Sequence, residues 1–346
     1  MNKFYALLLT VLLSTTGIFA QSNDYKVACI GFYNLENLFD YENDTLINDE
    51  EFLPEGSNAW TKERYEEKIA NMAFVISKIG TELTPHGASI LGVSEIENKR
   101  VLEDLISHPL LASRNYNIIH FDSPDRRGID VGMIYNPEHF KPLVSSSIPL
   151  DYVKDDGDTL ITRDILYVAG KLDDEIIHLM VNHWPSRRGG EEKTSKFRNA
   201  AAKVCHNYID SLLKVDINAK VFVMGDLNDN PDNESVRSII PAKAEKEELV
   251  AGDIYNPMYN KFKKGIGSNA YRDSWSLFDQ IIVTEGVVSK DQSGYFLYKT
   301  EIMSENFMVR RRGQYKGYPK RTFGGGEYLG GYSDHFPVYV YLTKKI

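Results

Sequence analysis

Cysteine is scarce in this sequence: Cys29 and Cys205 are the only two in 346 residues. Small exported domains that depend on disulfides are dense in cysteine, so this is not the sequence of a disulfide scaffold. Cys29 lies in a predicted strand and Cys205 on the apolar face of a predicted helix. We therefore expect two buried free thiols rather than a bridge.

Long apolar runs and positive charge are scarce as well. After residue 20 no segment is long and apolar enough to cross a bilayer, so we expect no stable membrane association. The formal net charge is −9, which argues against broad electrostatic capture of nucleic acid but not against local contact. Nothing in the sequence indicates an obligate protein partner, and we expect a monomer.

Several catalytic motifs are missing too. There is no GxSxG elbow of a serine esterase, no Walker loop of an NTPase, and no HExxH or other close histidine spacing for zinc. The segment "GDLNDNPDNE" (225–234) begins like a calcium loop, with Asp226, Asn228 and Asn230 at the first three ligand positions. Pro231 and Arg237 stand where an EF-hand needs Gly and Glu, so we reject an EF-hand.

The first twenty residues differ from the rest of the chain. Lys3 is their only charge, residues 4–13 are mostly apolar, and the stretch ends in "GIFA" before Gln21. A short basic start, an apolar stretch and a small residue at the cut are typical of a secretory signal peptide. We therefore expect residues 1–20 to be a signal peptide and residues 21–346 to form a single domain. Such a protein would be exported, to a periplasm or to the cell exterior.

Hydrophobic patterning predicts mixed α and β structure. Apolar positions at alternating steps of four and three predict a helix over about 62–79, and a similar face predicts a second over about 195–213. Strand-like runs are more numerous, and several are almost wholly apolar, as in sheets covered on both faces. We expect two mixed sheets in a sandwich with helices outside, and a long irregular segment over about 284–333. The predicted strands cover 27–33, 89–94, 116–121, 131–135, 165–171, 176–181, 220–224, 280–283 and 336–342.

Polar residues stand at the ends of these apolar runs. One such residue alone is usually a turn former or a helix cap, but six strand ends carrying Asn, Asp, Glu or His form a stronger pattern. If the last two strands run antiparallel to the others, all these groups meet at one rim of the sandwich. The set comprises Asn34, Glu95, His183, Asp226 and Asn228 after strands, and Asp279, Asp334 and His335 before strands.

Carboxylate and amide groups without cysteine form a set of hard oxygen donors. Such sets suit Mg²⁺, Mn²⁺ or Ca²⁺ better than zinc. We expect Mg²⁺ at this rim, with Mn²⁺ or Ca²⁺ as alternatives.

Seven segments of the chain, in this order, resemble the endonuclease/exonuclease/phosphatase superfamily, which has the deoxyribonuclease I-like fold. The resemblance runs from about residue 26 to residue 342. It implies an α/β (α+β) fold, a four-layered sandwich of two mixed β-sheets flanked by helices, and hydrolysis of a phosphoester by water with a divalent metal. The segments are "FYNLENLFD" (32–40), "GVSEIEN" (92–98), "RRGIDVGMIYNP" (126–137), "VNHWPSRRGG" (181–190), "MGDLNDNP" (224–231), "FDQIIV" (278–283) and "GGYSDHFPV" (330–338).

The resemblance also implies roles for single residues. Glu95 matches the main metal ligand, with Asn34 beside it and Asp334 next to the metal. Asp226 and Asn228 resemble the pair that orients the attacking water and the phosphate.

Two histidines complete the implied site. His335 resembles the histidine beside the scissile phosphorus, oriented by Asp279, and His183 resembles the one near the leaving group. Asp226 could share the role of base with His335. A carboxylate behind a histidine fixes its tautomer and lets it exchange a proton near neutral pH.

Arginines are the candidate substrate ligands. Arg163, in "TRDIL", resembles a phosphate-contacting arginine, and Arg187 follows His183 closely enough to bind substrate. Arg321 ends the segment "RRRGQYKGYPKR" (310–321), which holds six basic residues and no acid. This segment could grip a phosphate backbone while one of its two tyrosines stacks on a base. The alternative is a charged, solvated loop.

These observations favour an exported, divalent-metal-dependent nuclease. In this hypothesis water attacks a phosphodiester of nucleic acid, with His335 and Asp226 as base and orienting groups. A phosphoesterase acting on a lipid headgroup or a small phosphorylated compound is the alternative. No exposed apolar hairpin or basic amphipathic helix favours the lipid substrate. A catalytically inactive binding module is less favoured, because none of the expected site positions is replaced.

Overall fold

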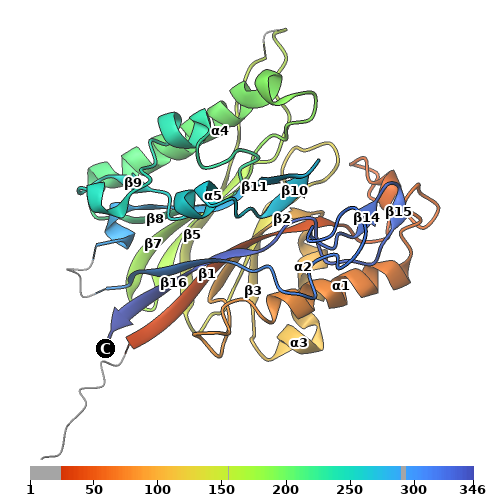
Figure 1. The fold of residues 1–346 in the computed structure, drawn as a ribbon, viewed down its shortest axis with the longest axis horizontal. Coiled ribbons are helices and arrows are strands. Elements are labelled where there is room, and N and C mark those ends of the chain that lie inside the picture. Colours follow the sequence, from red (N-terminus) through yellow and green to blue (C-terminus); the bar gives the residue numbers. More distant parts are fainter. Residues whose placement is uncertain (1–24, 155, 290–293) are drawn as a thin grey trace, which may run out of the picture.

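The computed structural model describes residues 25–154, 156–289 and 294–346. The predicted signal peptide, residues 1–20, lies outside the described residues and stays a prediction. Two six-stranded sheets pack face to face, and helices cover their outer faces (Figure 1). The expected four-layered sandwich of two mixed sheets is therefore confirmed.

The first sheet contains both the earliest and the latest strands of the described chain. Strand β1 runs parallel to β2, whereas the other neighbouring pairs are antiparallel. In spatial order the strands are β13 (Phe296–Ile302), β16 (Val338–Lys345), β1 (Tyr25–Leu38), β2 (Ile90–Ile96), β4 (Asp130–Tyr135) and β3 (Asn117–His120).

The second sheet is built from the middle of the chain. Only β7 and β8 are parallel neighbours in it. In spatial order the strands are β5 (Phe140–Ile148), β6 (Ile165–Leu172), β7 (Glu175–His183), β8 (Lys220–Asp226), β12 (Asp279–Thr284) and β9 (Ile254–Tyr255). Two small hairpins stand apart from the sheets: β10 (Asn269–Tyr271) with β11 (Ser274–Ser276), and β14 (Phe323–Gly324) with β15 (Glu327–Tyr328).

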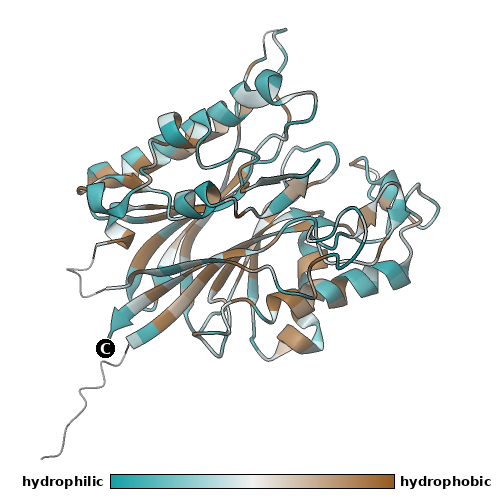
Figure 2. Cartoon of the chain, in the orientation of Figure 1, coloured by the Kyte–Doolittle hydropathy of each residue, from teal (hydrophilic) through white to brown (hydrophobic). Residues whose placement is uncertain are grey.

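Three apolar clusters hold the layers together. One lies between the sheets and includes Phe32, Val181 and Met224. The other two lie between each sheet and its helices, so apolar residues run along both faces of the central strands (Figure 2). Helices α1 (Lys62–Ile76), α2 (Lys99–Ser107) and α3 (Pro109–Ala112) cover the first sheet, α4 (Glu191–Val215) covers the second, and α5 (Tyr259–Lys263) is short. Short 3₁₀ turns lie at Glu50–Phe52, Lys246–Glu248 and Glu285–Val287, and a π-helical turn at Ser235–Ile239.

All nine predicted strands and both predicted helices are present, with shifted ends. Helix α1 ends at Ile76, three residues before the predicted end. The prediction of an irregular segment over 284–333 was wrong in part, because β13 lies inside it as an edge strand of the first sheet. Cys29 and Cys205 are buried and free, as expected. Among the described helices, none combines the length and apolar character needed to span a bilayer.

The last two long strands run in the direction that the rim requires. β16 is antiparallel to β1, and β12 is antiparallel to β8. The starts of β12 and β16 therefore lie beside the ends of their neighbours. One expectation about this rim was wrong: β1 does not stop before Asn34 but continues to Leu38, with a register shift against β2. Such an irregularity re-aims side chains at the end of a strand.

Candidate active site

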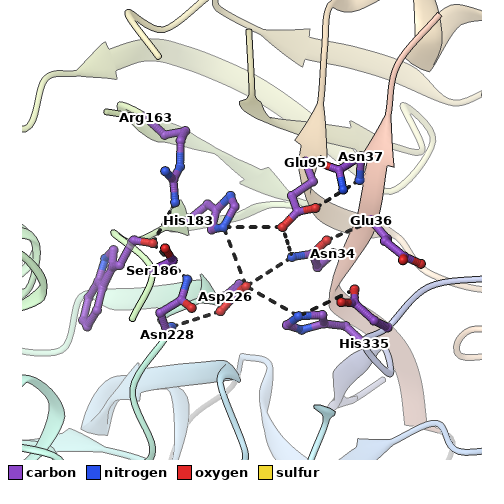
Figure 3. Close-up of polar contacts among 12 residues, drawn as sticks. Asn34, Glu36, Asn37, Glu95, Arg163, His183, Ser186, Asp226, Asn228 and His335 are labelled. Carbon is purple, nitrogen blue, oxygen red and sulfur yellow. Dashed lines mark hydrogen bonds and ion pairs between the residues drawn. The ribbon is translucent and has the colours of Figure 1, made fainter. Parts of the chain in front are cut away.

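Most of the side chains predicted to share the rim converge on Asp226, the last residue of β8 (Figure 3). Asn34 comes from β1 and Glu95 from β2, while His183 ends β7 and His335 precedes β16. Asp279, the first residue of β12, pairs directly with Asp226 across the sheet. The ends of both sheets thus supply one compact polar site.

Glu95 is held in place from two sides. Its Oε1 accepts a hydrogen bond from Asn34 Nδ2 at 3.1 Å, and its Oε2 accepts one from the backbone N–H of Asn37 at 3.0 Å. Glu95 has a φ of +57°, in the left-handed region that non-glycine residues seldom occupy. Backbone strain of this kind concentrates at functional sites, where the surrounding structure fixes an unusual side-chain direction.

Asn34 orients two carboxylates at once. Its amide nitrogen also donates to Asp226 Oδ2 at 3.1 Å, while its Oδ1 accepts from the backbone N–H of Glu36 at 2.9 Å. The Glu36 N–H can only donate, so it fixes which way the amide points. The nitrogen, and not the oxygen, therefore faces Glu95 and Asp226. Asn34 lies beside the expected metal ligand, and this orientation suits it to position that ligand.

Asp226 lies at the centre of the site and is almost fully buried. Burial raises its pKa to about 7; His335 opposes the rise, and the charges of Asp279 and Glu95 add to it. Its Oδ1 accepts from the backbone N–H of Asn228 at 3.0 Å. The site thus concentrates negative charge in a buried place, which a bound cation would relieve.

His335 forms a dyad with Asp279. The Nδ1 atom of His335 lies 2.6 Å from Asp279 Oδ2, and Asp279 is completely buried. Burial alone would lower the pKa of His335, but the carboxylates of Asp279 and Asp226 hold it well above its usual value. Because the carboxylate accepts at Nδ1, the Nε2 atom faces the site, 3.8 Å from Asp226 Oδ2.

His183 lies on the other side of Asp226. Its Nε2 is 3.7 Å from both Glu95 Oε1 and Asp226 Oδ2. Burial, followed by the positive charges of Arg163 and Arg127, lowers the pKa of His183 well below its usual value. The ring is therefore neutral, and with two carboxylates in front of Nε2 the hydrogen resides on that nitrogen. Its buried Nδ1 has no hydrogen-bond partner among the described residues.

The backbone carbonyl of Trp184 connects two predicted site residues. It accepts from Arg163 Nη2 at 2.8 Å and from Asn228 Nδ2 at 3.0 Å. The indole of Trp184 in turn donates to Asn182 Oδ1 at 3.0 Å. Arg163 also lies 3.3 Å from Asp125. Arg163 is buried and fixed, with its guanidinium close to His183.

Arg187 is engaged within the protein. Its guanidinium donates to the carbonyl of Asn228 at 2.7 Å and to Asp229 at 3.0 Å, and it packs over the ring of Phe278 at 4.7 Å. It therefore supports the loop that carries Asn228, and its contact with substrate stays a prediction. The neighbouring Arg188 is exposed, and its guanidinium has no partner in the described part of the chain.

Asp334 is engaged by an arginine at the border of the site. Its Oδ2 accepts from Arg321 Nη2 at 2.8 Å, and its Oδ1 lies 3.9 Å from His335 Nε2. Arg321 also reaches Glu36 Oε1 at 3.4 Å. Asp334 and Arg321 thus border the site on the His335 side, and their roles as metal and substrate ligands stay predictions.

The donor set at the centre fits a hard divalent cation. One ligand atom each from Glu95, His183 and Asp226 can lie within 4.8 Å of the others. Two of the three residues are carboxylates, which Mg²⁺ and Mn²⁺ prefer. The pKa of Asp226 is raised mainly by burial, and the charges of Asp279 and Glu95 add to the rise. Glu95 and Asp226 are therefore the residues that would hold the ion.

Sequence patterns missed several residues that shape the site. Asn37 contributes through its backbone, and Trp184 through a carbonyl, so their side-chain types carry no signal. Glu36 is buried, and burial together with the charge of Asp334 raises its pKa to about 7, against Lys68 and Arg321. Asn182 is visible in the sequence as a polar residue between an apolar run and His183, but its bond with the Trp184 indole is not.

A family model described as "Endonuclease/Exonuclease/phosphatase family" matches residues 29–344, most of the chain. No curated protein sequence matches the chain significantly. Many solved structures share the fold.

Three solved structures illustrate the likeness. An endonuclease/exonuclease/phosphatase family protein from Bacteroides thetaiotaomicron has a TM-score of 0.57 and 16% identity, covering 94% of this chain and 98% of that one. Zebrafish (D. rerio) TDP2 complexed with single-strand DNA product has a TM-score of 0.54 and 16% identity, covering 91% and 98%. A mannosyl-6-phosphatase from Bacteroides thetaiotaomicron has a TM-score of 0.55 and 16% identity, covering 91% and 99%. At these identities the likeness establishes the fold alone.

Proposed function

The chain belongs to the endonuclease/exonuclease/phosphatase family, whose superfamily comprises metal-dependent phosphoester hydrolases, and from this premise we propose that it is a nuclease. The observation that carries the proposal is a set of cations without ion-pair partners near Arg321, which borders the acidic site and lines one hollow with Arg310, Arg311 and Arg312. Arg310, Arg311 and Arg312 form no ion pair among the described residues, and neither does Arg188. In a protein of net charge −9, unpaired arginines beside the site suit a polyanionic substrate.

The proposed metal is Mg²⁺, held by Glu95 and Asp226 with Asn34 orienting both carboxylates. When bound, such an ion supplies positive charge to the non-bridging oxygens of the phosphate. Mn²⁺ would suit the same oxygen donors.

The two histidines are proposed to act on opposite sides of the phosphate. Asp279 fixes Nδ1 of His335, so Nε2 faces the attacking water and accepts its proton when the ring is neutral, a form that the raised pKa of His335 shifts to higher pH, while Asp226 orients the water. The neutral ring of His183 presents Nε2–H, which can donate a hydrogen bond to the leaving oxygen as its bond to phosphorus breaks, without giving up the proton. Asn228 and Arg163 are proposed to contact the phosphate oxygens, since the carbonyl of Trp184 holds both side chains beside the site.

Plasmid nicking tests this proposal. We expect purified residues 21–346 to nick supercoiled plasmid with Mg²⁺ or Mn²⁺ and to leave it intact with EDTA. His335→Ala should lower the rate by roughly 10²- to 10⁴-fold, the usual contribution of one acid–base group. Lys141→Ala, an exposed change in β5, is the control for folding and purity. If folded, Mg²⁺-binding protein cuts neither plasmid nor single-stranded DNA or RNA, the substrate is another phosphoester, such as a sugar phosphate.

We also propose that the protein is exported. The support is the sequence pattern of residues 1–20, a basic start followed by an apolar stretch and "GIFA". Expression of the full chain with its native start should yield a mature protein that begins at or near Gln21. Mass determination of the protein outside the cytoplasm checks this, and an unprocessed chain in the cytoplasm contradicts it.

A further inference from the structure

A hollow of about 640 Å³ opens beside the active site, between the β10–β11 hairpin and the segment 310–329. We call it the tyrosine hollow. Its lining includes Tyr271 and Arg272 from the hairpin, and Arg310, Tyr315 and Arg321 from the segment. The volume suits a ligand of the size of one nucleotide, because small-molecule sites range from about 300 to 1,000 Å³.

The tyrosine hollow is joined directly to the catalytic histidine. Asn269, the first residue of β10, forms an antiparallel bridge with His335. The backbone N–H of Phe336 donates to the carbonyl of Ser268 at 2.7 Å. Tyr271 follows Asn269 by two residues, which in a strand places it on the same side and about 7 Å farther along. A group held at Tyr271 would thus be a near neighbour of the phosphate at His335.

One tyrosine of the basic segment is structural. The hydroxyl of Tyr318 donates to Asp273 Oδ1 at 2.8 Å and accepts from the backbone N–H of Asp273 at 2.6 Å. Its ring also packs against Trp275 and Tyr315, with centroids 6.0 and 5.5 Å away. Tyr318 therefore fixes the two walls of the hollow relative to each other.

The other two tyrosines that line the hollow, Tyr271 on the hairpin and Tyr315 on the basic segment, have solvent-exposed rings. Tyr271 is 69% exposed and Tyr315 is 44% exposed. Each ring has an arginine over one face: Arg272 lies 5.1 Å from the centroid of Tyr271, and Arg310 lies 5.4 Å from that of Tyr315. Exposed aromatic rings beside cations are how proteins bind unpaired bases without sequence preference.

Further positively charged side chains line a second hollow next to the tyrosine hollow. A second hollow, of about 420 Å³, shares Arg310 and Arg321 with the first and adds Arg311, Arg312 and Lys320. No acidic residue is among those that line it. Anions, such as the phosphates on either side of a bound base, therefore suit this surface.

We propose that the tyrosine hollow is a nucleotide subsite that holds one unpaired base against Tyr271 and Tyr315, with its flanking phosphates on Arg310, Arg311 and Arg312. This inference rests on the proposed nuclease activity and adds a substrate class: single-stranded nucleic acid, extending from the scissile phosphate on the His335 side. A duplex keeps its bases stacked inside, so it cannot fill the hollow without unpairing.

Binding without cleavage tests the subsite. Fluorescence anisotropy with a short labelled oligothymidylate, in EDTA, measures affinity while the enzyme is inactive. Tyr271→Ala with Tyr315→Ala should weaken binding by about 5- to 150-fold, the loss expected for one stacked base. Phenylalanine at both positions keeps the rings and should retain the affinity. Inorganic polyphosphate, which has charge but no base, should bind the wild type and the alanine variant equally.

The salt dependence tests the arginines separately. Arg311→Ala with Arg312→Ala should reduce the slope of log affinity against log salt by about 0.7 for each phosphate that the variant no longer neutralises. Lys141→Ala with Lys171→Ala is the matched control, because these exposed cations face each other in β5 and β6, away from the site. If the lysine double variant reduces the slope as much as the arginine double variant, the oligothymidylate is attracted by the overall charge of the protein and not by these arginines.

The outcomes separate the subsite from the nuclease proposal. If the alanine tyrosine variant binds oligothymidylate as tightly as the wild type, or a matched duplex binds as tightly as the single strand, the subsite is wrong. Metal-dependent nicking would still stand in that case. If ring-dependent binding is found but the wild type cuts no nucleic acid, the subsite stands and the nuclease proposal is wrong.

Discussion

Arg198 is a buried cation whose removal should destabilise the whole protein. It lies on α4 with no exposed surface, and its Nε is 2.7 Å from Asp229 Oδ1. The Nε contact is an ion pair without hydrogen-bond geometry, while Nη1 donates to Thr194 Oγ1 at 2.9 Å and Nη2 to the Glu191 carbonyl at 3.3 Å. Replacement by methionine keeps much of the volume but leaves the Asp229 charge buried with fewer partners.

The expected loss is a few kilocalories per mole. Removing one partner of a buried ion pair typically lowers the free energy of unfolding by about 3–5 kcal/mol. Arg187 reaches the same oxygen of Asp229 at 3.0 Å, so we expect the lower half of that range. For about 320 folded residues the entropy of unfolding is roughly 0.7 kcal/mol/K, so Arg198→Met should lower Tm by about 4–6 °C.

Thermal and urea unfolding of four variants provide the assay. Arg198→Met and Asp229→Asn are measured alone and together, because the double variant removes the buried charge that each single variant strands. We expect the double variant to be more stable than the sum of the single losses predicts. Lys99→Met is the control: its ion pair with Glu103 is exposed on both sides, so the change should be within about 1 kcal/mol. A loss for Arg198→Met no greater than for Lys99→Met, or additive losses in the double variant, would refute the reasoning.

Two further predictions concern pH and metal. Burial raises the pKa of Glu175, but hydrogen bonds from Lys220 and Lys344 outweigh it and hold the pKa below its usual value. A depressed carboxyl stabilises the fold above its unfolded pKa, so Glu175→Gln should lower the free energy of unfolding by about 1 kcal/mol at pH 7. The difference in unfolding free energy between the variant and the wild type should narrow as the pH falls below the usual glutamate pKa, and close through the folded pKa; a difference that is as large at pH 3 as at pH 7 in urea titrations would contradict this. Asn34→Ala removes the amide that orients Glu95 and Asp226, so half-maximal activity should need roughly 10- to 100-fold more Mg²⁺. An unchanged Mg²⁺ titration, with His335→Ala as the inactive reference, would show that the amide does not position these carboxylates.

Most of the strands that the sequence revealed are central strands buried on both faces, although the edge strand β3 was predicted as well. The segment 220–224, "KVFVM", is nearly all apolar because both faces of β8 are covered by protein. Strand β5 escaped notice because it lies at a sheet edge, contains Pro142 and three serines, and leaves much of one face in water. Strand β13 escaped for the same reason, since "FLYKTEI" mixes charges with apolar residues at the opposite edge of the other sheet.

The site was predictable where side chains act and hidden where the backbone acts. Glu95, Asp226 and His335 stand out as polar residues next to apolar runs. The amide of Asn37 and the carbonyl of Trp184 do not, because every residue has these groups. Tyr271 was missed because "NAYRDSW" shows no strand alternation, and only its bridge to His335 through Asn269 brings it near the site.

The strand β16 is synthesised after all the other described strands, yet it lies inside the first sheet. β16 fills the gap between β13 and β1, and the Ser333 hydroxyl donates to the Asn34 carbonyl across 299 residues of sequence. A growing chain that has reached only residue 330 holds Glu95, His183 and Asp226 but lacks His335, and its first sheet is still split. Contacts of such long range form late in folding. The site would therefore be completed in a single late step, when the segment that carries His335 has been made, and a shorter chain would hold the metal-binding carboxylates without the histidine that faces them.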